Sequence, residues 1–167
     1  MPAAPPPDPQ ALDRAAELIG AASRPVVVAG LRCENPEAAG WVRAFVESLP
    51  APILLTAQAK GLFPETHPLA LGTLTGAEGD GGLLGLADLI VTCGLGPDEL
   101  DPRRWPSSAP GVHLAGTRGS ELPFPPLVEV PGDLSLILEE LAPRLRGKTR
   151  ADWDMFQLDR LKRERAG

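Results

Sequence analysis

The stretch Arg24-Pro-Val-Val-Val-Ala-Gly30 decides the fold. Three consecutive valines between a proline and a glycine predict a short strand that is buried on both faces, because a strand with one wet face alternates apolar and polar residues. Strands of this kind occur in parallel sheets that helices cover on both sides. We therefore expect an α/β protein in which this unit repeats along the chain.

Helix starts flank this strand on both sides. Asp8 and Asn35 are good N-caps, and each precedes a proline, which is favoured at the first helical position. Apolar residues then recur at helical spacing: Leu12, Ala15, Ala16 and Ile19 in the first helix, and Ala38, Val42, Phe45, Val46 and Leu49 in the second. A third amphipathic helix should follow Asp133, and a short helix should lie near 82–87.

Four more short apolar runs predict strands at Ile53–Thr56, Leu89–Gly94, Val112–Ala115 and Leu127–Val130. The Gly/Pro-punctuated stretch Ala57–Gly76 is interpreted as a connection. Strands that alternate with helices predict a three-layer, Rossmann-like fold with a mainly parallel sheet of five or six strands. Residues 1–9 are expected to form an extended lead-in, residues 10–147 the domain, and residues 148–167 a charged, linker-like tail.

Composition excludes several classes of protein. The 167 residues are enough for one domain, and a formal charge of −6 opposes nucleic-acid binding. The apolar runs are too short to span a membrane, and the first eight residues lack the regions of a signal peptide. The cysteines, Cys33 and Cys93, form no disulfide framework, so we expect a cytoplasmic protein with reduced thiols.

The tail carries Trp153, Phe156 and Leu161 among many charged residues, at spacings that only loosely approach a helical stripe. A short helix of this kind depends on tertiary packing for its stability. We expect the tail to dock through these apolar residues, either on its own domain or on a neighbouring copy.

Ligands of open parallel sheets usually lie outside the carboxyl ends of the strands. Gly30, Ala57–Gly61, Gly94 and Ala115–Gly116 mark those ends here. Glycine lets a backbone approach a phosphate closely, but it also simply permits a tight turn after a strand, and both interpretations stay open. The specific dinucleotide signature is absent, because Leu31-Arg32-Cys33 follows Gly30 and Glu99 replaces the third glycine after Gly94-Leu-Gly96.

Residues for catalysis or metal binding are scarce. His67 and His113 are isolated, so His113 is interpreted as a core residue of its strand and His67 as part of a turn. Cys93 is interpreted as a buried structural cysteine rather than a reactive thiol. No nucleophile elbow occurs. We therefore predict neither a catalytic residue nor a metal site.

The order of these motifs resembles the central domain of thiamine diphosphate-dependent enzymes such as acetolactate synthase and pyruvate oxidase. Arg24–Gly30 is similar to the opening strand of that domain, and Pro52–Pro68 carries the Lys-Gly, Pro-Glu and His-Pro pairs of the family, of which the run Lys60–Pro68 is the most distinctive part. Ala87–Gly94, Val112–Leu114 and Gly132-Asp133 resemble later segments, so that the similarity spans 11–145. The resemblance implies a fold of the DHS-like NAD/FAD-binding type.

The resemblance also implies that the cofactor-binding parts lie elsewhere. In this family the catalytic glutamate belongs to a pyrimidine-binding domain, and a magnesium ion holds the diphosphate through a Gly-Asp-Gly motif and an asparagine in another domain. Gly79-Asp80-Gly81 occurs here, but the only asparagine, Asn35, precedes it. Thiamine pyrophosphate binding and magnesium ion binding are therefore expected of the family and not of this chain.

Some members of the family bind FAD or an adenine nucleotide in the central domain. The residues matching the neighbourhood of that crevice are Gly30, Lys60, Gly61, Gly76, Gly79 and Gly94. Asp98 and Glu99 would repel a pyrophosphate there. No cofactor is therefore expected in the isolated chain, with FAD or an ADP-like nucleotide as the alternative.

Three functions remain as hypotheses. The first is a noncatalytic structural or assembly subunit, acting as a homodimer or with partner chains that carry the pyrimidine- and diphosphate-binding domains. The second is a module that binds an adenine nucleotide or acyl-CoA in the crevice, with positive charge from Arg32, Lys60, Arg103 and Arg118. The third, an enzyme on its own, lacks a convergent acid–base or nucleophile–base pair.

Overall fold

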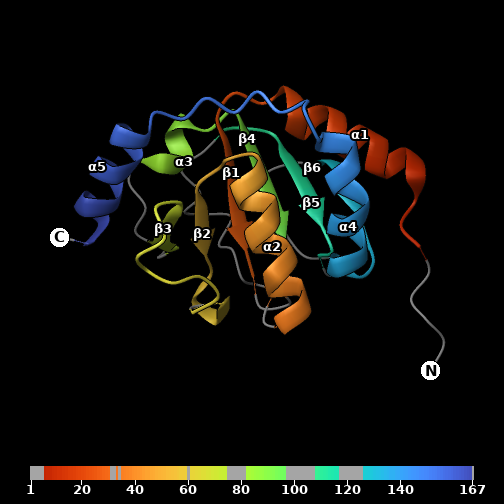
Figure 1. Cartoon of the computed structure of the whole chain (residues 1–167), viewed down its shortest axis with the longest axis horizontal. Coiled ribbons are helices and arrows are strands. Elements are labelled where there is room, and N and C mark those ends of the chain that lie inside the picture. Colours follow the sequence, from red (N-terminus) through yellow and green to blue (C-terminus); the bar gives the residue numbers. More distant parts are fainter. Residues whose placement is uncertain are drawn as a thin grey trace.

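A computed structural model describes residues 6–30, 33, 35–59, 61–74, 82–96, 108–116 and 126–166. Its centre is one sheet of six parallel strands in the order β3-β2-β1-β4-β5-β6 (Figure 1). The strands are β1 (Pro25–Ala29), β2 (Ile53–Leu55), β3 (Ala70–Thr73), β4 (Leu89–Cys93), β5 (Gly111–Leu114) and β6 (Pro126–Val130). The expected α/β class and parallel sheet are confirmed.

The helices begin where the sequence predicts. The Asp8 carboxylate accepts from the Gln10 N–H at the start of α1 (Pro9–Ala21), and the Asn35 side chain accepts from the Glu37 N–H at the start of α2 (Pro36–Ser48). Asp133 caps α4 (Leu134–Leu145) by accepting from the Leu136 N–H. The remaining helices are α3 (Leu83–Leu86), α5 (Met155–Ala166) and the 3₁₀ turn η2 (Ala57–Ala59).

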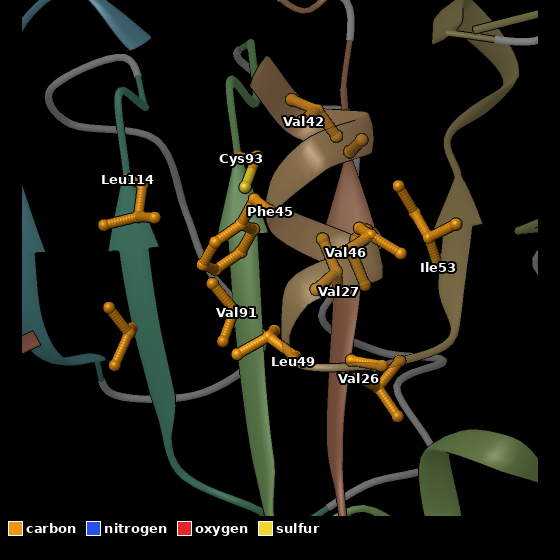
Figure 2. Packing of buried hydrophobic residues seen from close by; sticks show 14 of the residues in the cluster. Val26, Val27, Val42, Phe45, Val46, Leu49, Ile53, Val91, Cys93 and Leu114 are labelled. Atoms are coloured by element: carbon orange, nitrogen blue, oxygen red, sulfur yellow. The ribbon is translucent and has the colours of Figure 1, made fainter. Parts of the chain in front are cut away.

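Helices α1, α2 and α4 pack together on one face of the sheet. In Figure 2 the apolar side of α2 lies over the central strands, with Phe45 and Val46 above Val27 and Val91. Both valines are fully buried and are direct partners in the β1–β4 register. The three valines of β1 are all 0% exposed, as expected for a strand that is covered on both sides.

After β3 the side on which successive strands join the sheet changes. Strands β2 and β3 extend it on one side of β1, and β4, β5 and β6 extend it on the other. Helix α2 connects β1 to β2 on one side, whereas α3 lies in the connection that returns from the β3 edge to β4 on the other side of β1. Parallel crossovers are right-handed, so two connections that run in opposite directions lie on opposite faces. This arrangement gives the three layers that the sequence predicts.

One strand was not predicted. The stretch Ala57–Gly76 was interpreted as a connection, but its residues Ala70–Thr73 form β3, which pairs with β2. This edge strand contains Gly72, and Thr73 at its end is its only β-branched residue, so its sequence has a weak strand propensity. A register shift between Ile53 and Leu54 of β2 adds to its irregularity.

Asp88 joins two segments that are distant in the sequence. Its carboxylate oxygens accept from the N–H groups of Ser23 and Arg24, each at 2.9 Å. The Asp88 N–H in turn donates to the Arg24 carbonyl at 3.1 Å. These three bonds fix the turn between α1 and β1 against the start of β4.

The tail docks on its own domain, which is one of the two surfaces expected for it. The N–H groups of Arg150 and Asp152 donate to the carbonyls of Gly20 and Ser23 at 3.0 and 2.8 Å. The buried Trp153 indole donates to the Pro25 carbonyl at 2.8 Å, so the tail is attached to the beginning of the central strand. Gly20 permits this approach, because an added Cβ would lie 2.9 Å from the Lys148 carbonyl oxygen.

Helix α5 then packs alongside the edge strand β3 (Figure 1). Leu158 is fully buried, and the Lys162 ammonium donates to the carbonyls of Glu65 and His67 at 2.5 and 2.8 Å. The expectation that Phe156 is buried was wrong, since it is 88% exposed. The inner face of α5 carries Leu158, Leu161 and Lys162, and Phe156 lies on the outer side.

None of the helices in the described part of the chain is long and apolar enough to cross a membrane.

Candidate functional site

The crevice predicted from the sequence lies at the switch point between β1 and β4. Strand order runs outward from these two strands in both directions, and in such sheets ligands bind outside the carboxyl ends at this place. Gly30 follows β1 and Gly94 follows β4, so the structure brings these two predicted residues together. Both are buried.

The N–H groups of the two glycines have partners within the sheet. The Gly30 N–H donates to the Cys93 carbonyl, and the Gly94 N–H donates to the Leu114 carbonyl, each at 2.9 Å. A phosphate at a strand end is normally held by backbone N–H groups that point out of the sheet. Gly94 also has φ +63°, a left-handed conformation that favours glycine for reasons of the turn alone.

Two cysteines fill the space beside these glycines. The Cys33 N–H donates to the Gly30 carbonyl at 3.0 Å, and the Cys33 thiol donates to the Cys93 carbonyl at 3.3 Å. Burial raises the pKa of the Cys93 thiol well above its ordinary value, and the neighbouring Cys33 raises it further. Both side chains are 0% exposed, so Cys93 is a buried structural cysteine, as the sequence predicts.

The opposite face of the sheet carries three polar residues at the same end. Thr92, His113 and Glu129 are partners in the register of β4, β5 and β6, so their side chains lie on one face. The Thr92 hydroxyl lies 2.5 Å from His113 Nδ1, and both residues are buried. Burial lowers the pKa of His113, although the charge of Glu129 acts in the opposite direction.

In this Thr–His–Glu row the threonine and the histidine are buried, and only Glu129 is exposed. The Thr92 side chain is 0% exposed, so its hydroxyl is out of reach of a substrate. His113 Nε2 is buried and has no hydrogen-bond partner. It is directed at Gly116, where an added Cβ would overlap the imidazole ring. The prediction that His113 is a core residue is confirmed; the row itself was missed, and only the strand register could have revealed it.

Residues 61–68, the described part of the run that ends in His67-Pro68, form a compact turn beside the end of α2. His67 Nδ1 accepts from the Leu69 N–H at 3.1 Å, so the other ring nitrogen carries the proton and faces Glu47 Oε1 at 3.2 Å. The ring also meets Phe63 edge to face, with centroids 5.0 Å apart. The interpretation of His67 as a residue that fixes a turn is confirmed.

Of the other predicted crevice residues the structure describes only Gly61. Gly61 is exposed in the turn after η2 and has φ +100°, which explains a glycine by conformation alone. Lys60, Gly76 and Gly79 lie outside the described residues. So do Arg32, Arg103 and Arg118, the predicted sources of positive charge.

The described residues do not fit a magnesium–diphosphate site. Among them no group of three or more His, Cys, Asp or Glu side chains could hold a metal ion. Asn35, the only asparagine, uses its oxygen to cap α2, accepting from the N–H groups of Glu37 and Ala38. Gly79-Asp80-Gly81 lies outside the described residues.

A surface hollow lies between α1 and the segment that follows α4. Two of its lining side chains pair with each other, since Arg144 donates to Asp13 at 2.8 Å; Arg144 also donates to Glu140 at 3.1 Å. The hydrogen bond that Arg144 donates to Asp13 is the main cause that raises the pKa of Arg144. The hollow is therefore bordered by a salt-bridge network at a distance from the strand ends.

This chain belongs to the family of thiamine pyrophosphate enzyme central domains. The family pattern matches residues 12–141, which include all six strands and most of α4. The strand order and the switch point agree with the Rossmann-like fold that the resemblance implied.

Relatives support the same assignment. The chain is 31% identical over 156 residues to acetolactate synthase isozyme 1 large subunit of Escherichia coli, covering 90% of this chain and 27% of that protein. It is 30% identical to human 2-hydroxyacyl-CoA lyase 2, covering 93% and 26%, and 36% identical to sulfoacetaldehyde acetyltransferase of Rhodobacter capsulatus, covering 66% and 20%. The chain thus spans about a quarter of the length of these curated relatives, in which the matching region is part of a longer chain.

Proposed function

We propose that this chain is a noncatalytic central domain that serves as a structural and assembly unit of a thiamine diphosphate-type enzyme. It would act in the cytoplasm, either as a homodimer or together with chains that carry the pyrimidine- and diphosphate-binding domains. The family membership supports this proposal.

The switch point is the observation that carries the proposal. At the place where a Rossmann-like sheet would hold a ligand, the N–H groups of Gly30 and Gly94 continue the hydrogen bonding of the sheet. The buried thiols of Cys33 and Cys93 occupy the adjacent space. A crevice of this kind serves packing better than it serves recognition of a pyrophosphate.

Catalysis is also poorly supported by the described residues. The titratable side chains nearest the strand ends are a thiol whose pKa is raised and an imidazole whose pKa is lowered, both by burial. The imidazole, His113, has the exposed acid Glu129 as its register partner on β6, but the hydroxyl on its other side, that of Thr92, is fully buried. Convergent acid, base and nucleophile groups are what a catalytic site needs.

The strand order favours one other function. A sheet ordered 3-2-1-4-5-6 with glycines at its switch point is the usual frame for a dinucleotide. An adenine nucleotide or an acyl-CoA is therefore the second candidate ligand class. FAD or an ADP-like group bound here would need donors beyond the two glycine N–H groups described above.

Calorimetry separates these functions. The purified chain is titrated with thiamine diphosphate plus magnesium, then with FAD, ADP and an acyl-CoA. We expect no heat beyond dilution in any titration, and no released chromophore or nucleotide when the purified protein is denatured. Stoichiometric binding of FAD, ADP or acyl-CoA would establish the second function, and binding of thiamine diphosphate would refute the first.

A further inference from the structure

The outer face of α5 is a row of solvent-exposed side chains at helical spacing. Phe156, Asp159, Arg160 and Arg163 follow one another at intervals of three, one and three residues, which places them on one side of the helix. Phe156 is 88% exposed, and the side chains of Asp159 and Arg163 are 65% and 74% exposed. We call these four residues the outer row.

The inner face of the same helix is firmly attached. Leu158 is fully buried, and Lys162 donates to two backbone carbonyls of the turn before β3. Trp153, just before the helix, is bonded to β1. An exposed phenylalanine on a mobile tail would not define a surface. Phe156, however, lies on a helix that is held in place by the contacts of its inner face.

Charge is distributed unevenly along α5. The residues just before the helix are acidic, with Asp152 and Asp154 close in sequence to Phe156, whereas Arg160 and Arg163 lie in the second half of the helix. Within the outer row, Asp159 and Arg163 form an ion pair at 3.2 Å. Two such helices placed antiparallel would bring the acidic, apolar start of each against the basic half of the other.

We propose that α5 is a self-association surface that pairs antiparallel with α5 of a second copy of this chain. The spacing of the outer row is symmetric about its centre. An antiparallel pair in register therefore places Asp159 opposite Arg160 of the second copy, and Phe156 opposite Arg163 of the second copy. The first contact is an ion pair and the second a cation–π contact, and the two-fold axis repeats both.

This inference rests on the proposed assembly function and specifies its contact surface. Helix α5 has 12 residues and is about 18 Å long, so one face buries less than the roughly 1,200 Å² of a standard stable interface. The dimer is therefore weak and concentration-dependent. Because its ion pairs are exposed, added salt weakens it further.

The first test measures mass against concentration by sedimentation equilibrium. For the wild-type chain we expect the mean mass to rise from 17.6 kDa toward the dimer as concentration increases, and to fall when salt is added. Phe156→Ser should weaken dimerisation about tenfold or more. Met155→Ser, next to Phe156 but outside the outer row, is the matched control and should leave the mass unchanged.

Charge reversal gives a sharper test. Asp159→Arg and Arg160→Asp each set like charges against each other across the two-fold axis, so each variant alone should be monomeric. Mixed in equal amounts they should form a dimer, because all the central contacts between the two different chains are then between opposite charges. Circular dichroism and thermal melts of both variants check that the fold is kept.

The results separate this inference from the function it rests on. A chain that stays monomeric at every concentration, or a dimer that Phe156→Ser and the charge reversals leave intact, would overturn the α5 surface. A dimer that these substitutions leave intact would still support assembly through another face. Stoichiometric cofactor binding in calorimetry would refute the proposed function whatever α5 does.

Discussion

The centre of the sheet and the tail are stabilised by different kinds of interaction. Apart from Thr92, the side chains of β1 and β4 are apolar and buried, and the two strands are joined by backbone hydrogen bonds. The tail buries few side chains, among them Trp153 and Leu158, and relies on individual polar contacts such as those of Lys162. The stability of the centre should therefore fall when a polar side chain is introduced anywhere in it. The attachment of the tail should weaken when particular residues are removed.

The largest effect is expected in the centre. Ile90→Asp places an unpaired charge at a position that is 0% exposed, beside Val26 of β1, and should cost more than about 4 kcal/mol of unfolding free energy. Chemical denaturation followed by circular dichroism measures it. Glu37→Asp, on the exposed first turn of α2, is the control and should change stability by less than about 0.5 kcal/mol. Equal losses in the two variants would show that β4 is not a buried central strand.

Next in size is the main anchor of the tail. Trp153→Ala removes a buried indole and its hydrogen bond to Pro25, and should cost about 3 kcal/mol. Phe156→Ala on the same tail removes an exposed ring and should leave the melting temperature of the monomer almost unchanged. If both substitutions are neutral, the tail does not stabilise the domain.

A smaller effect tests the close packing at the end of β5. Gly116→Ala forces a methyl group into the His113 ring and should cost about 1–3 kcal/mol. Gly85→Ala in α3, where an added Cβ meets nothing within 4 Å, is the matched control and should be neutral or slightly stabilising. Combining Gly116→Ala with His113→Ala should remove the penalty of the alanine at 116; an additive double variant would contradict this contact.

The smallest effect is the pH dependence of His113. Burial lowers its pKa from the ordinary 6.5, so the folded state favours the neutral ring. The stability that the neutral His113 ring contributes is therefore fully present above pH 6.5, the ordinary pKa. This stability is lost as pH falls from that value toward the lower pKa of the folded state. Denaturation from about pH 8 to about pH 5 should therefore show a steeper loss in the wild type than in His113→Gln. Parallel profiles would mean that His113 titrates alike in the folded and unfolded states.

Much of the centre was predictable because its signals are local. Asp8, Asn35 and Asp133 each precede an apolar helical pattern, and the valines of β1 form an unbroken run. The edge strand β3 was not predictable, since Ala70–Thr73 is short and contains a glycine, and only pairing with β2 makes it a strand.

The candidate site and the tail depended more on tertiary contacts. Sequence order placed Gly30 and Gly94 at strand ends, but only the sheet order makes them neighbours. Their bonded N–H groups follow from the register, which no local pattern encodes. Phe156 was assigned to the wrong side of α5 because the inner face is selected by β3 and the turn at Glu65, not by hydrophobicity.

The strand order also has a consequence for the chain as it leaves the ribosome. The first three strands complete one half of the sheet, β3-β2-β1, before any residue of β4 has been synthesised. In that half-sheet the strand Pro25–Ala29 is not yet central: it is an open edge of valines with unpaired backbone groups. Such edges are where nascent chains stick to one another. The 59 residues between Ala29 and Leu89 therefore set how long a nascent chain is at risk, and any pause in translation within them lengthens that interval.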